Sequence, residues 1–417
     1  MTIETISVIA AIIFALALIH TFAAKSFEVL AHKHPKHAGL FHLLGEIEVV
    51  FGFWAFILIA LMALVTSGSH ALAYVESRQY TEPLFVFVIM VVAASNPVLQ
   101  IVKTLVQKFA RALPVNAVLG QVWLSLALVP LIGSLITEPA AMTLAALMLA
   151  PLVFRAGIPE WLKYAALGVL FVNVSIGGTL TSYAAPPVLM VANTWGWDSM
   201  HMLQHFGYKA AIAVMLNATV LTFLLRKHFM TPEKIQMEAI KIPVAISLIH
   251  LAFLAGVVVF AHHMVVFIGL FMLFLGFTQA YERYQTPLIL KQALLVGFFL
   301  AGLVVLGGLQ QWWLQPIVSA LQPIQLFFGA TALTAITDNA ALTYLGSLIS
   351  GMSDQAKYML MAGAVTGGGL TVIANAPNPA GISLLKHGFT GESISAVGLL
   401  LGALPPTVVA AFFFLAL

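Results

Sequence analysis

Long apolar stretches, separated by short polar segments, run along the whole chain. A stretch of roughly 20 apolar residues is long enough to cross the hydrocarbon core of a bilayer as a helix. Membrane strands would instead need short segments of alternating apolar and polar residues, which these long runs do not provide. The pattern predicts an all-α polytopic membrane protein with ten full crossings, at about 5–24, 41–65, 84–102, 164–194, 207–225, 242–261, 263–279, 292–309, 358–385 and 393–417.

Two further apolar segments, 115–154 and 317–349, are each too long for a single crossing. Polar residues interrupt each of them near its middle, at 137–139 (Thr-Glu-Pro) and at 337–339 (Thr-Asp-Asn). We therefore expect two re-entrant hairpins, which enter and leave the membrane on the same side. The Ser-Asn-Pro sequence at 95–97 should kink the third crossing, because proline removes a backbone hydrogen bond.

The basic residues test this topology independently, because cytoplasmic loops carry an excess of Lys and Arg. With the N-terminus outside, all but three of the eighteen Lys and Arg lie on the inner side; the exceptions are Arg78, Lys209 and Lys357. The C-terminus then also lies outside. No basic region precedes the apolar segment 5–24, so we interpret this segment as the first crossing and not as a cleaved signal.

The most polar stretch, about 226–242, is predicted to be a cytoplasmic linker between two halves, 1–225 and 243–417. Each half holds five crossings and one hairpin. Because five is odd, the second half must insert upside down relative to the first. Inverted repeats of this kind are a recurring architecture of secondary transporters.

Two motifs recur in the same order in the two halves. Residues 136–143 read ITEPAAMT and residues 336–343 read ITDNAALT, with five of eight positions identical. Residues 177–187 read GGTLTSYAAPP and residues 367–377 read GGGLTVIANAP, with six of eleven identical. Two ordered matches at similar offsets indicate an internal duplication.

Composition agrees with a membrane location and excludes several functions. Charged residues make up 8% of the chain, against about 25% in soluble domains, and 61% of residues are hydrophobic. The chain has no cysteine, so disulfides, thiolate metal sites and cysteine nucleophiles are excluded. The net charge of +3 is small and gives no indication of a nucleic-acid partner.

Glu138 and Asp338 are the two acidic residues that fall deep within apolar sequence, each at a predicted hairpin tip. In inverted halves the two tips should meet near the membrane midplane. An ionisable group at that depth is costly and indicates a functional site. The alternative is a carboxylate paired with a buried base, but no Lys or Arg is predicted at that depth.

The repeated Gly and Pro residues lie inside crossings and should break two helices. Broken helices release carbonyl oxygens and expose partial charges that bind ions. Small residues also permit close helix packing, but polar neighbours in repeated positions favour a binding site. The predicted ion-binding residues are Thr137, Glu138, Gly177, Gly178, Thr181, Ser182, Thr337, Asp338, Asn339, Gly368, Thr371, Asn375 and Asn378.

Carboxylate, hydroxyl, amide and carbonyl oxygens are hard ligands that suit Na⁺ or H⁺ and lack the softness for copper or zinc. Burial favours a protonated carboxyl group, whereas a bound cation favours the ionised form. Na⁺ and H⁺ should therefore compete at Glu138 and Asp338, and alternating access with such competition is antiport. No cofactor is expected; Na⁺ and H⁺ are the transported ions.

The tip motifs and the broken-helix motifs resemble those of the ion transporter superfamily, which includes arsenite permeases, NhaD-type sodium/proton antiporters and sodium-coupled dicarboxylate carriers. The chain is most similar to the bacterial "putative sodium/proton antiporter" family. This resemblance implies a bacterial inner-membrane protein, usually a homodimer, in which hairpins and broken helices form a transport domain with elevator-like movement. The dicarboxylate carriers have Ser-Asn-Thr tips, and the acids here favour a cation over an anion.

Glu46 and Glu48 lie near the inner end of the second predicted crossing and could relay protons. Because helix ends reach water easily, we favour interfacial carboxylates that are solvated or paired with Lys36.

Three other functions compete with antiport. A Na⁺- or H⁺-coupled importer of a small anion would share the fold, but the predicted interior contains no Lys or Arg. An intramembrane hydrolase lacks support, because His-Glu-x-x-His and Gly-x-Ser-x-Gly motifs are absent. A passive channel would lack coupling between the Na⁺ and H⁺ gradients.

Overall fold

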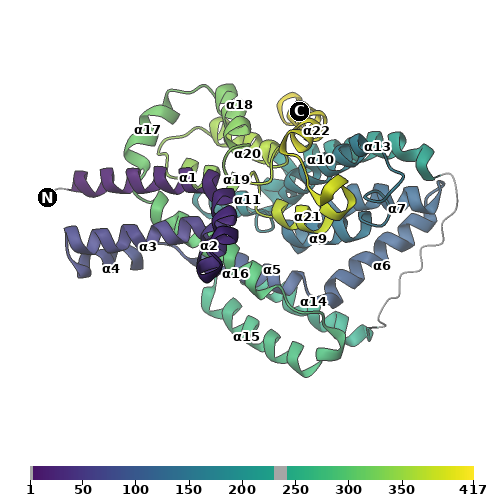
Figure 1. Ribbon diagram of the computed structural model, residues 1–417, viewed down its shortest axis with the longest axis horizontal. Coiled ribbons are helices and arrows are strands. Elements are labelled where there is room, and N and C mark those ends of the chain that lie inside the picture. Colours follow the sequence, from purple (N-terminus) through teal and green to yellow (C-terminus); the bar gives the residue numbers. More distant parts are fainter. Residues whose placement is uncertain (1–2, 230–241) are drawn as a thin grey trace.

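The computed structural model describes residues 3–229 and 242–417, and these residues form helices and no strand (Figure 1). The predicted all-α class is therefore confirmed. Within these described residues, five helical segments are long and apolar enough to cross a membrane, and counting each of two bent helix pairs as one span raises this number to seven. The ten crossings, their orientation and the division into domains stay predictions.

The first six helices cover the first three predicted crossings, two of which are interrupted, and a short helix lies between the second and the third. The six helices are α1 (Ile3–Lys33), α2 (Ala38–Gly45), α3 (Ile47–Val65), the short α4 (Gly68–Glu76), α5 (Thr81–Ala93) and α6 (Asn96–Ala112). The predicted crossing 41–65 is not continuous, because the extended backbone of Glu46 (φ −77°, ψ 115°) separates α2 from α3. The kink expected at 95–97 is confirmed, since α5 and α6 meet at 62° and Pro97 lies in the first turn of α6.

The segment 115–154 folds as a helical hairpin. Its first arm consists of α7 (Ala117–Leu126) and α8 (Leu128–Ile136), which are bent by 42° relative to each other, and its second arm is α9 (Glu138–Leu149). A broken helix follows, with α10 (Glu160–Gly177) separated from α11 (Pro186–Trp195) by a short 3₁₀ turn and an irregular stretch. The helices α12 (Ser199–Met202) and α13 (Tyr208–Leu225) complete this half.

The predicted linker 226–242 lies largely outside the described residues; its first four residues form a 3₁₀ turn, Arg226–Phe229. The second half repeats the order of a hairpin followed by a broken helix. Its helices are α14 (Val244–Val259), α15 (Met264–Ala280), α16 (Leu290–Gly307), α17 (Gln311–Ser319), the hairpin arms α18 (Pro323–Thr334) and α19 (Asn339–Ser347), the broken pair α20 (Asp354–Gly367) and α21 (Asn378–Leu385), and α22 (Ala396–Ala416).

Glycines bring several helix pairs into backbone contact. α3 packs on α16 at Gly302, where an added Cβ would overlap the backbone of Gly52. α10 packs on α22, where a Cβ on Gly168 would overlap the backbone of Gly402. Close approach through small residues is typical of helix packing in membranes. In Figure 1, α1, α3 and α4 project to the left, whereas α14 and α15 lie along the lower edge.

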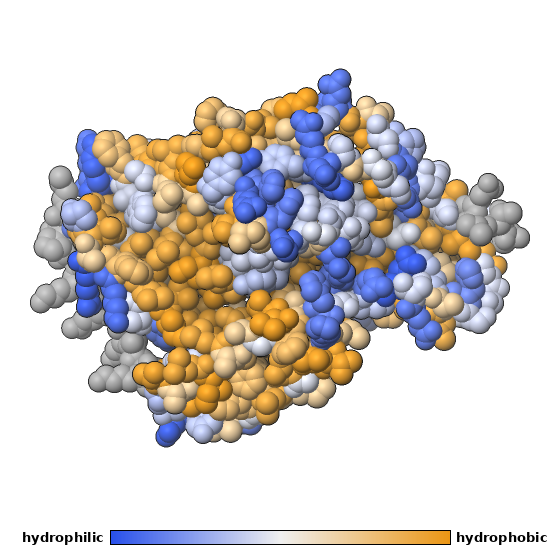
Figure 2. Space-filling model, turned by 180° about the vertical axis from the view of Figure 1, so that it is seen from behind, coloured by the Kyte–Doolittle hydropathy of each residue, from blue (hydrophilic) through white to orange (hydrophobic). Residues whose placement is uncertain are grey.

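The outer surface is broadly apolar. Figure 2 shows a continuous hydrophobic area over much of one face, with hydrophilic residues gathered at the left edge and toward the right of the view. Large side chains such as Leu64 and Val265 are each 82% exposed. Soluble monomers rarely expose contiguous apolar areas of this kind, so the surface is suited to contact with lipid.

Candidate functional site

The first hairpin tip brings a carboxylate into the protein interior. α8 ends at Ile136, and Thr137 turns the chain with a positive φ of 81° before α9 begins at Glu138. A positive φ in a threonine costs about 1–3 kcal/mol and often marks a functional position. The Glu138 side chain is fully buried, and its Oε1 has no hydrogen-bond partner, nor does the buried Thr137 Oγ1.

The second tip places Asp338 at the start of α19. Its Oδ1 accepts hydrogen bonds from the backbone amides of Ala340 (2.8 Å) and Ala341 (3.2 Å), so Asp338 is the N-cap of this helix. The following residue, Asn339, is fully buried, and both polar atoms of its side chain lack a partner. Asp338 lines a small cavity together with Asn375, the residue that is hydrogen-bonded to Glu138.

The break in the first half surrounds Glu138 closely. Gly178 leaves no room for a side chain, because a Cβ there would overlap the Glu138 carboxyl group. Gly177 packs against the backbone of Pro130 in α8. The hydroxyl of Thr181 donates to the carbonyl of Ser134 at 2.6 Å, which holds the break against the end of α8.

The break in the second half contributes four of the predicted residues, of which Gly368, Thr371 and Asn378 hold the break itself together. Gly368 lies beside Asn339, whose Nδ2 would be 3.0 Å from an added Cβ. The Asn378 Nδ2 donates to the carbonyls of Gly368 and Thr371, both at 2.8 Å, and its Oδ1 has no partner. The hydroxyl of Thr371 donates to the carbonyl of Ala335 at 2.8 Å.

Asn375 joins the two halves. Its Nδ2 donates to Glu138 Oε2 at 2.8 Å, and its own Oδ1 remains without a partner although the residue is 1% exposed. Among the described residues, eight buried side-chain atoms without a partner belong to the tips and to the second broken helix: Thr137 Oγ1, Glu138 Oε1, Thr334 Oγ1, Asn339 Oδ1 and Nδ2, Thr366 Oγ1, Asn375 Oδ1 and Asn378 Oδ1. Each such atom costs about 1–3 kcal/mol unless a ligand satisfies it, so this region is suited to a polar ligand.

Matching backbone contacts link each tip to its own broken helix. The amide of Glu138 donates to the carbonyl of Ala184 at 3.4 Å, and the amide of Asn339 donates to that of Ala374 at 3.1 Å. Ala374 follows Ala184 by 190 positions, as the repeated motif requires, whereas Asn339 follows Glu138 by 201. The contacts therefore make Asn339, and not Asp338, the counterpart of Glu138.

The glycine environments show the same register. Gly178 faces the Glu138 side chain, and Gly368 faces the Asn339 side chain. Thr137, the residue before α9, corresponds to Asp338, the residue before α19. One half thus presents a buried acid and the other a buried amide at the same place.

Two predicted residues lie away from this arrangement. Ser182 contacts Ser199, at the start of α12, with its backbone amide and its hydroxyl, both at 3.2 Å. The Thr337 hydroxyl donates to the carbonyl of Leu333 within its own helical turn at 2.9 Å. Among the described hydrogen bonds, neither hydroxyl is bonded to Glu138.

Ser134 and Ser175 are functional candidates that the motifs missed. Ser134 accepts a hydrogen bond from the amide of Leu180 (2.9 Å) and donates to the carbonyl of Gly177 (2.7 Å), so it fixes the first break to α8. Ser175 donates to the carbonyl of Val365 at 2.7 Å and connects α10 with α20. Ser134 lies two residues before the repeated motif, and this position is the only feature of the sequence that could have indicated its role.

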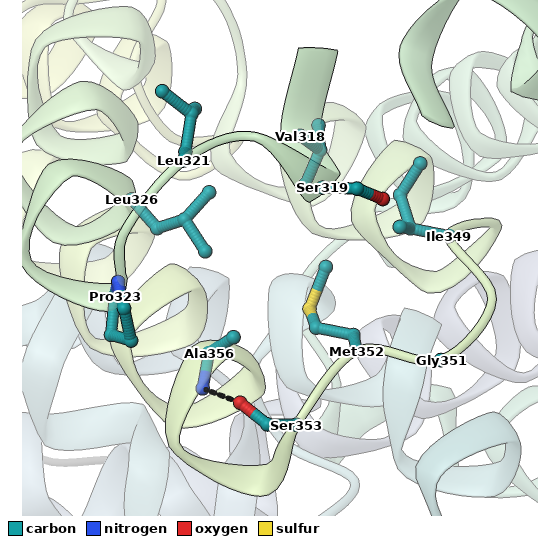
Figure 3. A pocket seen from close by; sticks show the side chains of 10 residues that line it. All are labelled: Val318, Ser319, Leu321, Pro323, Leu326, Ile349, Gly351, Met352, Ser353 and Ala356. Carbon is teal, nitrogen blue, oxygen red and sulfur yellow. Dashed lines mark hydrogen bonds between the residues drawn. The ribbon is translucent and has the colours of Figure 1, made fainter. Parts of the chain in front are cut away.

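A pocket of about 220 Å³ lies at the open end of the second hairpin (Figure 3). Met352 points into it, and its rim includes the hydrogen bond from the Ala356 amide to the Ser353 hydroxyl at 3.2 Å. Its lining contains no titratable side chain: Val318, Ser319, Leu321, Pro323, Leu326, Ile349, Gly351, Met352, Ser353 and Ala356. A site of this composition has no acid to neutralise a cation.

The apolar surface and the buried carboxylates define a helical membrane protein with an acidic interior site. A family model described as "Putative Na+/H+ antiporter" matches residues 5–417, which is nearly the whole chain. The chain belongs to this family, and the resemblance noted in its sequence is confirmed. The family is one of ion transporters, so a lipid bilayer and small ions are its partners. No curated protein matched the chain.

Proposed function

We propose that the protein exchanges Na⁺ for H⁺ across the bacterial inner membrane, and that the two ions compete for one region formed by Glu138 and Asp338. The observation that carries this proposal is the 2.8 Å hydrogen bond from Asn375 to Glu138. This bond brings the second broken helix against the acid of the first tip. Family membership supports Na⁺/H⁺ exchange in general, and the contacts support these residues in particular.

The available ligands are hard oxygen atoms. Glu138 Oε1, Thr137 Oγ1 and Asn375 Oδ1 are buried and have no hydrogen-bond partner. Oxygen ligands of this kind suit a hard cation. A carboxylate oxygen that holds a proton cannot also ligate Na⁺, so occupancy by one ion excludes the other at that oxygen. Exclusive occupancy gives coupled exchange when access alternates between the two sides.

The proposal includes two inverted halves whose re-entrant hairpins meet near the membrane midplane, with both termini on the periplasmic side. The matching contacts of the two tips support the duplication, and the distribution of Lys and Arg supports the orientation. Each tip is also bonded to its own broken helix, through Thr181 and Thr371. These bonds favour movement of tip and broken helix as one unit, as an elevator-like mechanism requires. The homodimer stays a prediction.

An anion importer on the same fold is the alternative. Helix N-termini at the tips carry partial positive charge and could bind an anion. At the second tip, however, the amides of Ala340 and Ala341 are already bonded to Asp338. The protein's own carboxylate thus occupies the position that a transported anion would need.

Reconstitution into liposomes that contain a pH-sensitive dye tests the proposal. With the membrane potential clamped by K⁺ and valinomycin, external Na⁺ should make the interior more alkaline, whereas choline should not. Sodium entry without coupled proton movement would identify a channel. If Na⁺ drives no proton flux at any pH, antiport is wrong, and uptake of anions with Na⁺ should be measured next.

A further inference from the structure

A small cavity separates α3 from the second hairpin tip. Its volume is about 30 Å³, and its lining includes Glu48, Asp338, Asn375, Val296 and Phe299. A space of roughly 10–15 Å³ already holds one water molecule, so this cavity has room for a single small ion or water. It is the place where a carboxylate of α3 meets a tip carboxylate.

The two acids of this cavity come from distant parts of the chain and repel each other. Glu48 lies in the first turn of α3, and Asp338 caps α19. Both side chains line the same cavity, so their charges repel each other when both carboxyl groups are ionised. Two carboxylates that face one small, mostly apolar space are costly unless a cation lies between them. The geometry therefore favours an ion at this position.

An unpartnered amide oxygen independently indicates a ligand. Asn375 is 1% exposed and lines the cavity, and its Oδ1 has no hydrogen-bond partner. Its Nδ2 is bonded to Glu138 Oε2. The orientation of this amide is thus fixed by the first tip, and its free oxygen is available to a cation in the cavity.

The break between α2 and α3 directs Glu48 inward. Glu46 occupies the break, is 33% exposed at its side chain, and forms an ion pair with Lys291 at 3.1 Å. Glu46 is therefore a partly exposed, paired carboxylate, as expected, but its partner is Lys291 and not Lys36. Glu48 is half-buried and lines the cavity. Because Glu46 and Glu48 are close in sequence but have different surroundings, a substitution of Glu46 is a matched control for the same substitution of Glu48.

We propose that Glu48, Asp338 and Asn375 form a Na⁺ site, here called the α3 site, which is complete only when the second tip packs against α3. Glu48 is then a Na⁺ ligand contributed from outside the two hairpins and broken helices. A cation bound here bridges α3 and the tip and holds them together. The inference deepens the proposed function, on which it rests for the identity of the ion.

The test measures Na⁺ binding separately from transport. Purified protein in detergent is heated at increasing NaCl, with choline chloride holding the ionic strength constant, and the Na⁺ dependence of Tm gives an apparent Kd. Glu48→Gln should raise this Kd at least tenfold, whereas Glu46→Gln should leave it within twofold. Glu48→Asp keeps the charge on a shorter side chain and should give an intermediate Kd.

Equal Kd values for Glu48→Gln and Glu46→Gln would overturn the α3 site, as would wild-type protein without Na⁺-dependent stabilisation. If Glu48→Gln does not give monodisperse protein, a wild-type Kd in Glu48→Asp would also overturn it. The liposome assay separates this inference from the proposed function. Na⁺ binding that depends on Glu48, without Na⁺-driven proton flux, would retain the site and reject antiport.

Discussion

Asn375 Nδ2 donates a hydrogen bond of 2.8 Å to Glu138 Oε2, and this bond connects residues 237 positions apart in sequence. Glu138 is fully buried, and its other carboxylate oxygen has no partner. A buried carboxylate held by one amide on one side is oriented but not neutralised. In the proposed site, residues from both halves of the molecule therefore contribute to the binding of one ion.

Asn375→Ala should reduce exchange at least tenfold. Hydrogen bonds to charged groups contribute about 1.5–3 kcal/mol, and every 1.4 kcal/mol corresponds to a factor of ten. The initial rate of Na⁺-driven proton flux in liposomes measures the effect. Asn193→Ala, at an exposed position of α11, is the control and should behave as wild type. Equal rates in the two variants would show that the Asn375 contact is not required.

Gly178→Ala should abolish exchange, because its Cβ would overlap the Glu138 carboxyl group and force that side chain to move. Gly269→Ala introduces the same methyl group in α15, where, among the described residues, nothing besides the local backbone of α15 lies within 4 Å of the added Cβ. This control should retain full activity and gain up to about 1 kcal/mol of helix stability. The initial rate of Na⁺-driven proton flux and the Tm are measured for both variants. Normal exchange in Gly178→Ala would contradict the assigned position of Glu138.

Thr137→Val tests whether the unpartnered hydroxyl binds the ion. Valine keeps the shape and the backbone strain of Thr137 but removes Oγ1, so we expect the apparent KM for Na⁺ to rise about three- to tenfold, consistent with the loss of one neutral oxygen ligand worth about 1 kcal/mol. Thr337→Val is the matched control, because the Thr337 hydroxyl is bonded to Leu333 and should not contribute. A rise in KM only in the Thr337 variant would reverse the assignment of these two residues.

The apparent KM for Na⁺ should rise as the pH falls. Protons and Na⁺ compete for the same carboxylate oxygens, so acidification leaves fewer sites that can bind Na⁺. In the fully competitive range, one pH unit should change KM by about tenfold, while the maximal rate at saturating Na⁺ changes less. Initial rates over a matrix of pH values and Na⁺ concentrations measure this. A KM independent of pH would exclude shared binding.

The sequence predicted the positions where the chain must break. Gly177 and Gly178, like Gly367 and Gly368, lie where α10 and α20 end, and Pro97 begins α6 after the expected kink. Proline and glycine weaken or end a helix through the local backbone alone, because proline lacks an N–H donor and glycine lacks a side chain. These features therefore required no knowledge of tertiary contacts.

The register of the two tips could not be predicted from sequence. Matching ITEP with ITDN pairs the two acids, but α9 begins at Glu138 whereas α19 begins one residue after Asp338. Aspartate is a strong N-cap, so Asp338 remains outside its helix and bonds the first amides. Glutamate caps less well, and Glu138 lies inside α9 with its side chain directed to Asn375. This difference depends on helix capping, and counting identical residues in the two motifs does not detect it.

The position of Glu48 beside Asp338 could not be predicted for a related reason. Counting residues along one continuous crossing, 41–65, places Glu48 near a membrane surface. The break at Glu46 begins a new helix there, and the ion pair of Glu46 with Lys291 joins residues 245 positions apart. Neither the break nor this partner has a signal in the local sequence.

Na⁺-driven proton flux in proteoliposomes containing Glu138→Gln or Asp338→Asn tests the central claim most directly. Glu160→Gln and Asp354→Asn are the matched controls, because these acids also lie at helix N-termini but bond the surface groups Thr390 and Lys357. We expect either tip substitution to abolish or uncouple the flux and both controls to retain it. Wild-type flux in both tip variants would contradict the assignment of the exchanged ions to these carboxylates.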